Sequence, residues 1–121
     1  MAGHSITRVG LADLDELLGL MRAYCDFYEV SPPDEDLLTI ARALIADPVN
    51  EGVQLIARDS TGRAVGFATV YWTWSTTSGC RIGIMNDLFL AEDSRGRGIA
   101  ERLIEACRAE CSERGARQLP P

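Results

Sequence analysis

The sequence contains no lysine, so all of its 12 basic residues are arginine. This absence excludes a phosphate loop of the GxxxxGK[ST] type, which needs its lysine. The single histidine is His4 and no Cys-x-x-Cys pair occurs, so no set of residues has the spacing of a zinc site. No apolar run approaches the ~20 residues of a membrane-spanning helix, and the first ten residues lack an apolar signal core. We therefore expect a cytoplasmic protein without a bound metal.

The 18 acidic residues outnumber the 12 basic ones, so the formal net charge is −6 over 121 residues. Such a chain would repel the phosphates of nucleic acid, whereas it is compatible with a cationic small molecule or peptide. Hydrophobic residues make up 46% and charged residues 25%, which is typical of a globular domain. We expect one domain, a small-molecule or peptide partner, and neither a nucleic-acid nor a membrane partner.

The four cysteines are Cys25, Cys80, Cys107 and Cys111. Cys107 and Cys111 are four residues apart on an expected helix, so both thiols face the same side. Two thiols without further ligands do not make a metal site, and a small buried thiol is the commoner case. We predict core cysteines, with no zinc and no disulfide.

Hydrophobic spacing predicts four strands and three helices. Strands are expected at residues 6–9, 53–57, 65–74 and 81–90. Helices are expected at residues 11–28, 33–45 and 98–114. The resulting order, β-α-α-β-β-β-α, predicts an α/β fold.

The chain ends soon after the last expected helix. A strand followed by a long helix usually returns to a parallel strand. Residues 117–119 would only begin such a strand before Pro120 and Pro121 stop it. We therefore expect a domain over residues 1–121 that is incomplete at its C-terminus, unless a second subunit supplies the missing part.

Residues 95–100, Arg-Gly-Arg-Gly-Ile-Ala, stand between an apolar strand and an amphipathic helix. The first amides of a helix have no intrahelical partner, and glycines let such amides converge on an anion. The arginines suit phosphate oxygens, so we interpret the segment as a pyrophosphate site. The alternative is an ordinary tight turn with solvated arginines. A dinucleotide fingerprint is disfavoured because Glu101 stands where a third small residue is needed.

The same segment fits the pattern [RQ]-x-x-G-x-[GA] after an apolar strand, within the stretch NDLFLAEDSRGRGIAERLIEA. With the leading strand, two early helices and the hairpin around Val65-Gly66-Phe67-Ala68, the whole chain resembles the GCN5-related N-acetyltransferase (GNAT) superfamily. The resemblance implies a mixed, mostly antiparallel sheet with helices on both faces. It also implies acetyl-CoA as co-substrate, with its pyrophosphate on the glycine segment and its pantetheine arm along the preceding strand. The cofactor-binding residues expected on this basis are Leu88, Phe89, Leu90, Arg95, Gly96, Arg97, Gly98, Ile99 and Ala100.

Asn86 and Asp87, which directly precede the apolar residues 88–90, are candidates for the catalytic site. Similar polyamine-acetylating proteins carry a carboxylate at the position of Asn86, which here could order a water instead. By strand alternation Asn86 shares a face with Leu88 and Leu90, while Asp87 points to the other face. A structural hydrogen bond is the alternative role for Asp87. The tyrosine that protonates the departing thiolate in similar proteins has no counterpart in Tyr24, Tyr28 or Tyr71.

The acceptor site is expected between the first two helices, because the resemblance places substrate choice there. The residues proposed to bind the acceptor are Asp26, Tyr28, Glu29, Asp34 and Glu35. Carboxylates beside aromatic rings would attract a cationic amine and cover its methylenes. A solvated loop with helix-start charges is the alternative. Trp72 and Trp74 share a strand face and are expected in the core.

These features predict an acetyl-CoA-dependent N-acetyltransferase that acts on a primary amine by direct attack in a ternary complex. The alternative is a non-catalytic or truncated acyl-CoA-binding module. With no returning strand, the edge at residues 82–90 and the helix residues Ile99, Leu103, Ala106 and Cys107 would lack cover. We therefore also expect a homodimer through this edge, and weak or absent turnover of the 121-residue chain.

Overall fold

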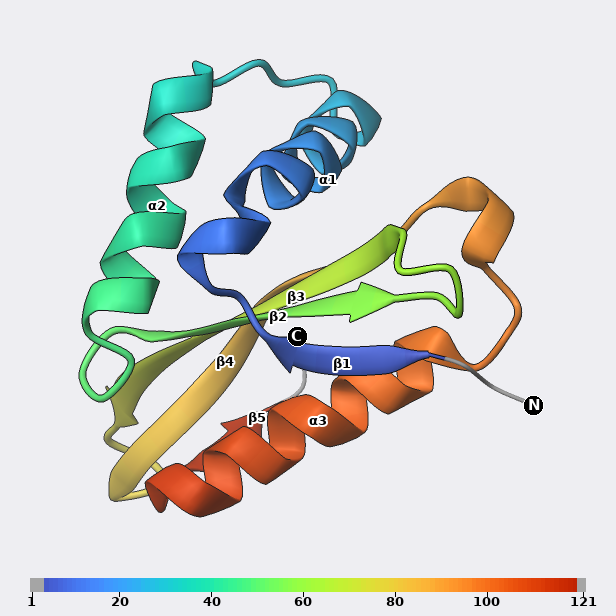
Figure 1. Ribbon diagram of the computed structural model, residues 1–121. Coiled ribbons are helices and arrows are strands. Elements are labelled where there is room, and N and C mark those ends of the chain that lie inside the picture. The colour runs from blue at the N-terminus through green and yellow to red at the C-terminus, as the bar shows by residue number, and fades with distance from the viewer. Residues whose placement is uncertain (1–3, 120–121) are drawn as a thin grey trace.

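The computed structural model describes residues 4–119 and shows one sheet with helices on both faces (Figure 1). The helices α1 and α2 cover one face, and α3 lies across the other. The elements in chain order are β1 (Ser5–Arg8), the 3-10 turn η1 (Leu11–Asp13), α1 (Leu14–Phe27), α2 (Asp34–Ala46), β2 (Gly52–Arg58), β3 (Ala64–Ser75), β4 (Cys80–Leu90), the 3-10 turn η2 (Glu92–Ser94), α3 (Ile99–Arg114) and β5 (Arg117–Leu119). The predicted bounds of the first seven regular elements hold to within one to three residues.

The five strands lie in the order β1-β2-β3-β4-β5. The first three pairings are antiparallel and the last, between β4 and β5, is parallel. The predicted fold class, a mixed and mostly antiparallel sheet between two helical layers, is therefore confirmed.

The expectation that α3 returns to no strand is wrong. After the helix ends at Gly115, the Ala116 amide donates to the Cys111 carbonyl at 2.8 Å, which turns the chain back toward the sheet. Arg117–Leu119 then pair with Ile82–Ile84 as β5.

The expected lack of cover on α3 is also wrong, because the helix packs directly on the sheet. Ile99, Leu103 and Cys107 are at most 1% exposed, and Ala106 packs against the same core. The homodimer stays a prediction, but this argument for it is removed.

Both faces of the sheet are buried, so β2 and β3 read as nearly continuous buried runs rather than alternating ones. Toward α3 the core contains Val70, Trp72 and Leu103, and toward α1 and α2 it contains Leu17 and Phe67. Trp72 is 7% exposed as predicted. The core prediction for Trp74 is wrong: this residue lies one position before the end of β3, is 70% exposed, and has the Arg81 guanidinium 5.0 Å from the centre of its ring.

The cysteine prediction holds for three residues, since Cys25, Cys107 and Cys111 are buried. Burial raises the pKa of Cys107 to about 12, so its thiol stays protonated and unreactive. Cys80, at the start of β4, is half-buried.

None of the helices within residues 4–119 combines the length and apolar character that crossing a bilayer requires.

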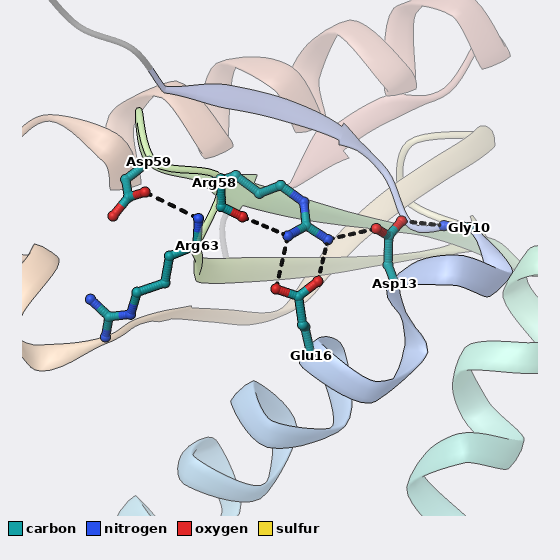
Figure 2. Close-up of polar contacts among 7 residues, drawn as sticks. Gly10, Asp13, Glu16, Arg58, Asp59 and Arg63 are labelled. Atoms are coloured by element: carbon teal, nitrogen blue, oxygen red, sulfur yellow. Dashed lines mark hydrogen bonds and ion pairs between the residues drawn. The ribbon is translucent and has the colours of Figure 1, made fainter.

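Arg58 ties the start of α1 to the β2–β3 hairpin (Figure 2). Its Nη2 lies 2.7 Å from Asp13 Oδ1 and 2.8 Å from Glu16 Oε1, and its Nη1 donates to the Gly62 carbonyl at 2.9 Å. The second oxygen of Asp13 accepts the Gly10 amide at 2.8 Å. The amide of Gly10 and the Arg58 guanidinium together hold the pKa of Asp13 below its usual range.

We expect Arg58→Met to lower the melting temperature by roughly 5 °C at pH 7, because three charge-assisted contacts are lost together. Asp13 contributes stability above its unfolded pKa of about 3.9, and loses that contribution as the pH falls through its lower folded value. The difference between wild type and variant should therefore narrow from pH 7 to pH 3, measured by thermal denaturation. A constant difference would show that the carboxylates are not involved.

Candidate functional site

The end of β4 carries a bulge. Met85 pairs with Val70 and Asp87 pairs with Thr69, so Asn86 is an extra residue in the ladder. The side-chain Nδ2 of Asn86 donates to Asp87 Oδ1 at 3.0 Å, although neighbouring side chains on a regular strand point to opposite faces. Strict alternation therefore breaks at Asn86, whose side chain lies beside that of Asp87. Asp87 itself lies near Tyr24 of α1 while Leu88 packs toward α3, so these two residues are on opposite faces.

Beyond the bulge, β4 keeps one open edge. Its pairing with β5 covers only Ile82–Ile84 within the described residues. On the other side, the Ala91 amide donates to the Val65 carbonyl at 2.8 Å. Antiparallel pairs alternate, so the backbone groups of Leu88 and Leu90 point away from β3, toward that open edge. The Leu88 amide and carbonyl and the Leu90 amide are available to an extended ligand, whereas the Leu90 carbonyl accepts a hydrogen bond from Arg95 Nε.

The loop of residues 95–100 lies directly after η2 and opens α3. Gly96 and Gly98 have φ angles of +76° and +79°, which non-glycine residues rarely adopt, and neither would bring an added Cβ within 4 Å of another atom. The first helical hydrogen bond runs from the Arg102 amide to the Gly98 carbonyl at 3.2 Å. Within residues 4–119, no acceptor takes up the amides of residues 98–101. The loop therefore exposes backbone donors at the positive end of the α3 dipole.

The two arginines of the loop are placed differently. Arg95 Nε donates to the Leu90 carbonyl at 3.1 Å, and its guanidinium lies 5.7 Å from the centre of the Phe89 ring. Arg95 thus joins the loop to the end of β4. Arg97 is exposed. On the preceding turn, Asp93 pairs with Arg63 of the β2–β3 hairpin at 3.0 Å, which braces the loop from behind.

A cavity of about 580 Å³ connects the open edge of β4, the 95–100 loop and the end of α1. Eight predicted site residues line it, namely Tyr28, Leu88, Phe89, Leu90, Arg95, Gly96, Gly98 and Ala100. Of the other predicted cofactor residues, Arg97 lies outside the lining and the side chain of Ile99 is 1% exposed in the core. The role predicted for Ile99 needs only its backbone amide, for which residues 4–119 provide no acceptor.

Sequence reasoning missed three residues of the cavity lining: Tyr24, Phe27 and Glu101. Tyr24, Phe27 and Tyr28 have the spacing i, i+3, i+4, which places them together on a helix. That spacing was the available signal.

Asn86 and Asp87 do not line the cavity, but Asp87 lies next to Tyr24, which does. Burial, and after it the negative charge of Asp87, raises the pKa of Tyr24. The same two causes raise the pKa of Tyr71. Both phenols therefore stay protonated at neutral pH and can donate hydrogen bonds.

The predicted acceptor carboxylates fall into two groups. Asp34 pairs with Arg22 at 2.6 Å and Glu35 pairs with Arg42 at 3.1 Å, so both charges are partly compensated. Asp26 and Glu29 are exposed at the end of α1, beside Tyr28.

Comparison with known proteins gives two sequence matches. A model of the acetyltransferase (GNAT) domain matches residues 50–119, which is more than half of the chain. The uncharacterized N-acetyltransferase YhfO of Bacillus subtilis (strain 168) is 30% identical over 115 residues, covering 95% of this chain and 75% of YhfO.

Solved structures share the fold. A ribosomal-protein-alanine N-acetyltransferase from Brucella melitensis biovar Abortus 2308 matches with a TM-score of 0.76 at 27% identity, over 98% of this chain and 79% of that one. The aminoglycoside N-acetyltransferase AAC(6')-Iy, solved in complex with CoA, matches with a TM-score of 0.85 at 21% identity, over 100% and 78%. The family match over residues 50–119 contains the whole of β4, the glycine loop and α3, and this chain belongs to the GNAT family of acetyltransferases.

Proposed function

We propose that the chain is an acetyl-CoA-dependent N-acetyltransferase that acetylates a primary amine in a ternary complex. The observation that carries this proposal is the cavity that joins the amides of the 95–100 loop, the open edge of β4 and the aromatic end of α1. A single cavity thus joins a site for an anion, an extended backbone edge and an aromatic surface. This combination suits a coenzyme bound next to an acceptor. The CoA and acetyl-CoA named with structural neighbours support the same coenzyme here.

The coenzyme is proposed to bind along the cavity in two parts. Its pyrophosphate would accept hydrogen bonds from the amides of Gly96, Gly98, Ile99 and Ala100, with Arg95 and Arg97 as nearby charges. Its pantetheine arm would pair with the outward amide and carbonyl of Leu88 and with the Leu90 amide, beside the Phe89 ring. A β4 amide would then polarise the thioester carbonyl.

Transfer requires a neutral amine, since a primary amine is protonated at neutral pH. The nitrogen attacks the thioester carbonyl carbon, the new C–N bond forms and the C–S bond breaks. The amine loses a proton, and the departing thiolate gains one to leave as the free thiol of CoA. We propose that Asn86 and Asp87, joined at the bulge just outside the cavity lining, order a water that relays the proton of the ammonium group to bulk solvent before attack.

The acceptor is proposed to be a cationic amine in its free state. Asp26 and Glu29 are the two proposed acceptor carboxylates for which the described residues provide no ion pair. Asp34 and Glu35 contribute less field because Arg22 and Arg42 compensate them. Tyr28 lies in the cavity lining and would contact the acceptor directly.

The test is release of CoA thiol from acetyl-CoA with and without a panel of primary amines, with mass spectrometry of the amine. We expect an added acetyl group on the amine and amine-dependent thiol release, at the low rate predicted from the sequence for the 121-residue chain. The absence of lysine helps, since no lysine side chain of this chain can be acetylated and mistaken for turnover. Acetyl-CoA binding without transfer to any amine would instead support the acyl-CoA-binding module.

A further inference from the structure

The end of α1 forms an aromatic wall of the cavity, consisting of Tyr24, Phe27 and Tyr28. The ring centres of Tyr24 and Tyr28 are 5.1 Å apart, and those of Phe27 and Tyr28 are 5.2 Å apart at 86°. Tyr24 also contacts Phe89 of β4, with centres 6.1 Å apart. These edge-to-face contacts hold the rings in a defined arrangement before any ligand arrives.

Two of the three rings are largely uncovered. Phe27 is 67% exposed and Tyr28 is 59% exposed, although both lie against the cavity. Single exposed apolar residues are common, but here two adjacent rings share one hollow with a third. Covering them with an apolar group would release ordered water and bury both the ligand and the rings.

The charges of the cavity do not favour a polycation. Arg95 and Glu101 are its only charged lining residues among those described, and they have opposite signs. Asp26 and Glu29 belong to the rim outside the lining, and the carboxylates of Asp34 and Glu35 are paired. Attraction at the rim can guide an ammonium group, but the surface that contacts the bound acceptor is aromatic.

We propose that the acceptor is a primary amine carried on an apolar, ring-bearing stem, and that Phe27 and Tyr28 bind this stem. The inference rests on the proposed function and names the substrate class of the same cavity. A free arylalkylamine and a peptide whose first residue has an aromatic side chain present the same chemistry. A polyamine or a polyhydroxylated aminosugar lacks the apolar stem.

The experiment measures acceptor binding rather than turnover. Calorimetric titration of the CoA-saturated chain should show 2-phenylethylamine binding at least roughly ten-fold more tightly than spermidine, from the apolar area that the ring covers. Phe27→Ala should weaken 2-phenylethylamine roughly ten-fold and leave spermidine unchanged. Trp74→Ala is the matched control, since it removes an equally exposed aromatic ring far from the cavity and should change neither affinity.

Two outcomes would overturn the inference: spermidine binding as tightly as 2-phenylethylamine, or an affinity for 2-phenylethylamine that is unaffected in both Phe27→Ala and Tyr28→Ala. Both residues are mostly exposed, so neither variant should fail to fold. Phe-Gly-Gly amide as a second ligand separates the sources, because tighter binding than 2-phenylethylamine identifies a peptide acceptor. If CoA itself does not bind, the proposed function fails, and the amine titrations of the free chain still test the aromatic wall.

Discussion

Replacing Gly98 by aspartate is expected to abolish acetyl-CoA binding, with an affinity loss of more than roughly a hundred-fold. Gly98 precedes the first residue of α3, where unpaired amides and the helix dipole favour an anion. A carboxylate at this position would place a negative charge against the pyrophosphate and would take up the same amides. Isothermal titration calorimetry with acetyl-CoA measures the effect directly.

Two controls separate charge from backbone strain in this test. Asparagine has nearly the same size as aspartate and tolerates the same positive φ, but it carries no charge. Gly98→Asn should therefore lower the acetyl-CoA affinity only about ten-fold. Gly79→Asp puts the same charge at a similar φ of +66° in the β3–β4 turn, at the opposite end of β4 from the 95–100 loop, and should leave binding unchanged. Unaltered acetyl-CoA affinity in Gly98→Asp would refute the proposed pyrophosphate site.

The second large effect is expected at Gly66 in β3, where the backbone of β4 approaches closely. A Cβ added there would overlap Leu90 Cδ2 and lie 2.8 Å from the Phe89 carbonyl oxygen. Gly66→Ala should therefore push apart the two strands that position the proposed pantetheine edge, at a cost of roughly 1–3 kcal/mol. Both the free energy of unfolding, from urea denaturation, and acetyl-CoA affinity should fall.

Gly19→Ala is the matched substitution, because Gly19 is an exposed helical residue of α1 with no atom within 4 Å of an added Cβ. Its alanine variant should gain roughly 0.5–1 kcal/mol through higher helix propensity. Equal effects at the two glycines would show that close strand approach at Gly66 does not matter.

The sequence alone determined those features that depend on neighbours along the chain. Helical and strand spacing located seven elements, and the resemblance to the GNAT superfamily implied the mixed sheet between two helical layers that the structure shows. The position of the 95–100 loop could also be predicted from the sequence. A run of apolar strand residues, two glycines and a helix start follow one another directly, and amides at a helix start are unpaired for a local reason.

Only the tertiary structure decided which of these residues meet. The bulge at Asn86 breaks strand alternation, and it depends on pairing with Thr69 and Val70 rather than on the local sequence. The parallel pairing of β5 with Ile82–Ile84 also joins segments that lie far apart in the chain. Hydrophobic periodicity records which face of an element is apolar, but the register between elements depends on contacts across the sheet.

The character of the acceptor region changed for the same reason. From the sequence, Asp34 and Glu35 appear as free charges, whereas folding pairs them with Arg22 and Arg42. Tyr24 and Phe27 have the spacing of ordinary core residues, whereas the path of α1 past the end of β4 sets them in the cavity lining. Residue type and spacing thus determined the proposed coenzyme loop, because its chemistry lies in consecutive backbone amides. The proposed acceptor surface was decided by packing, because it is assembled from side chains of separate elements.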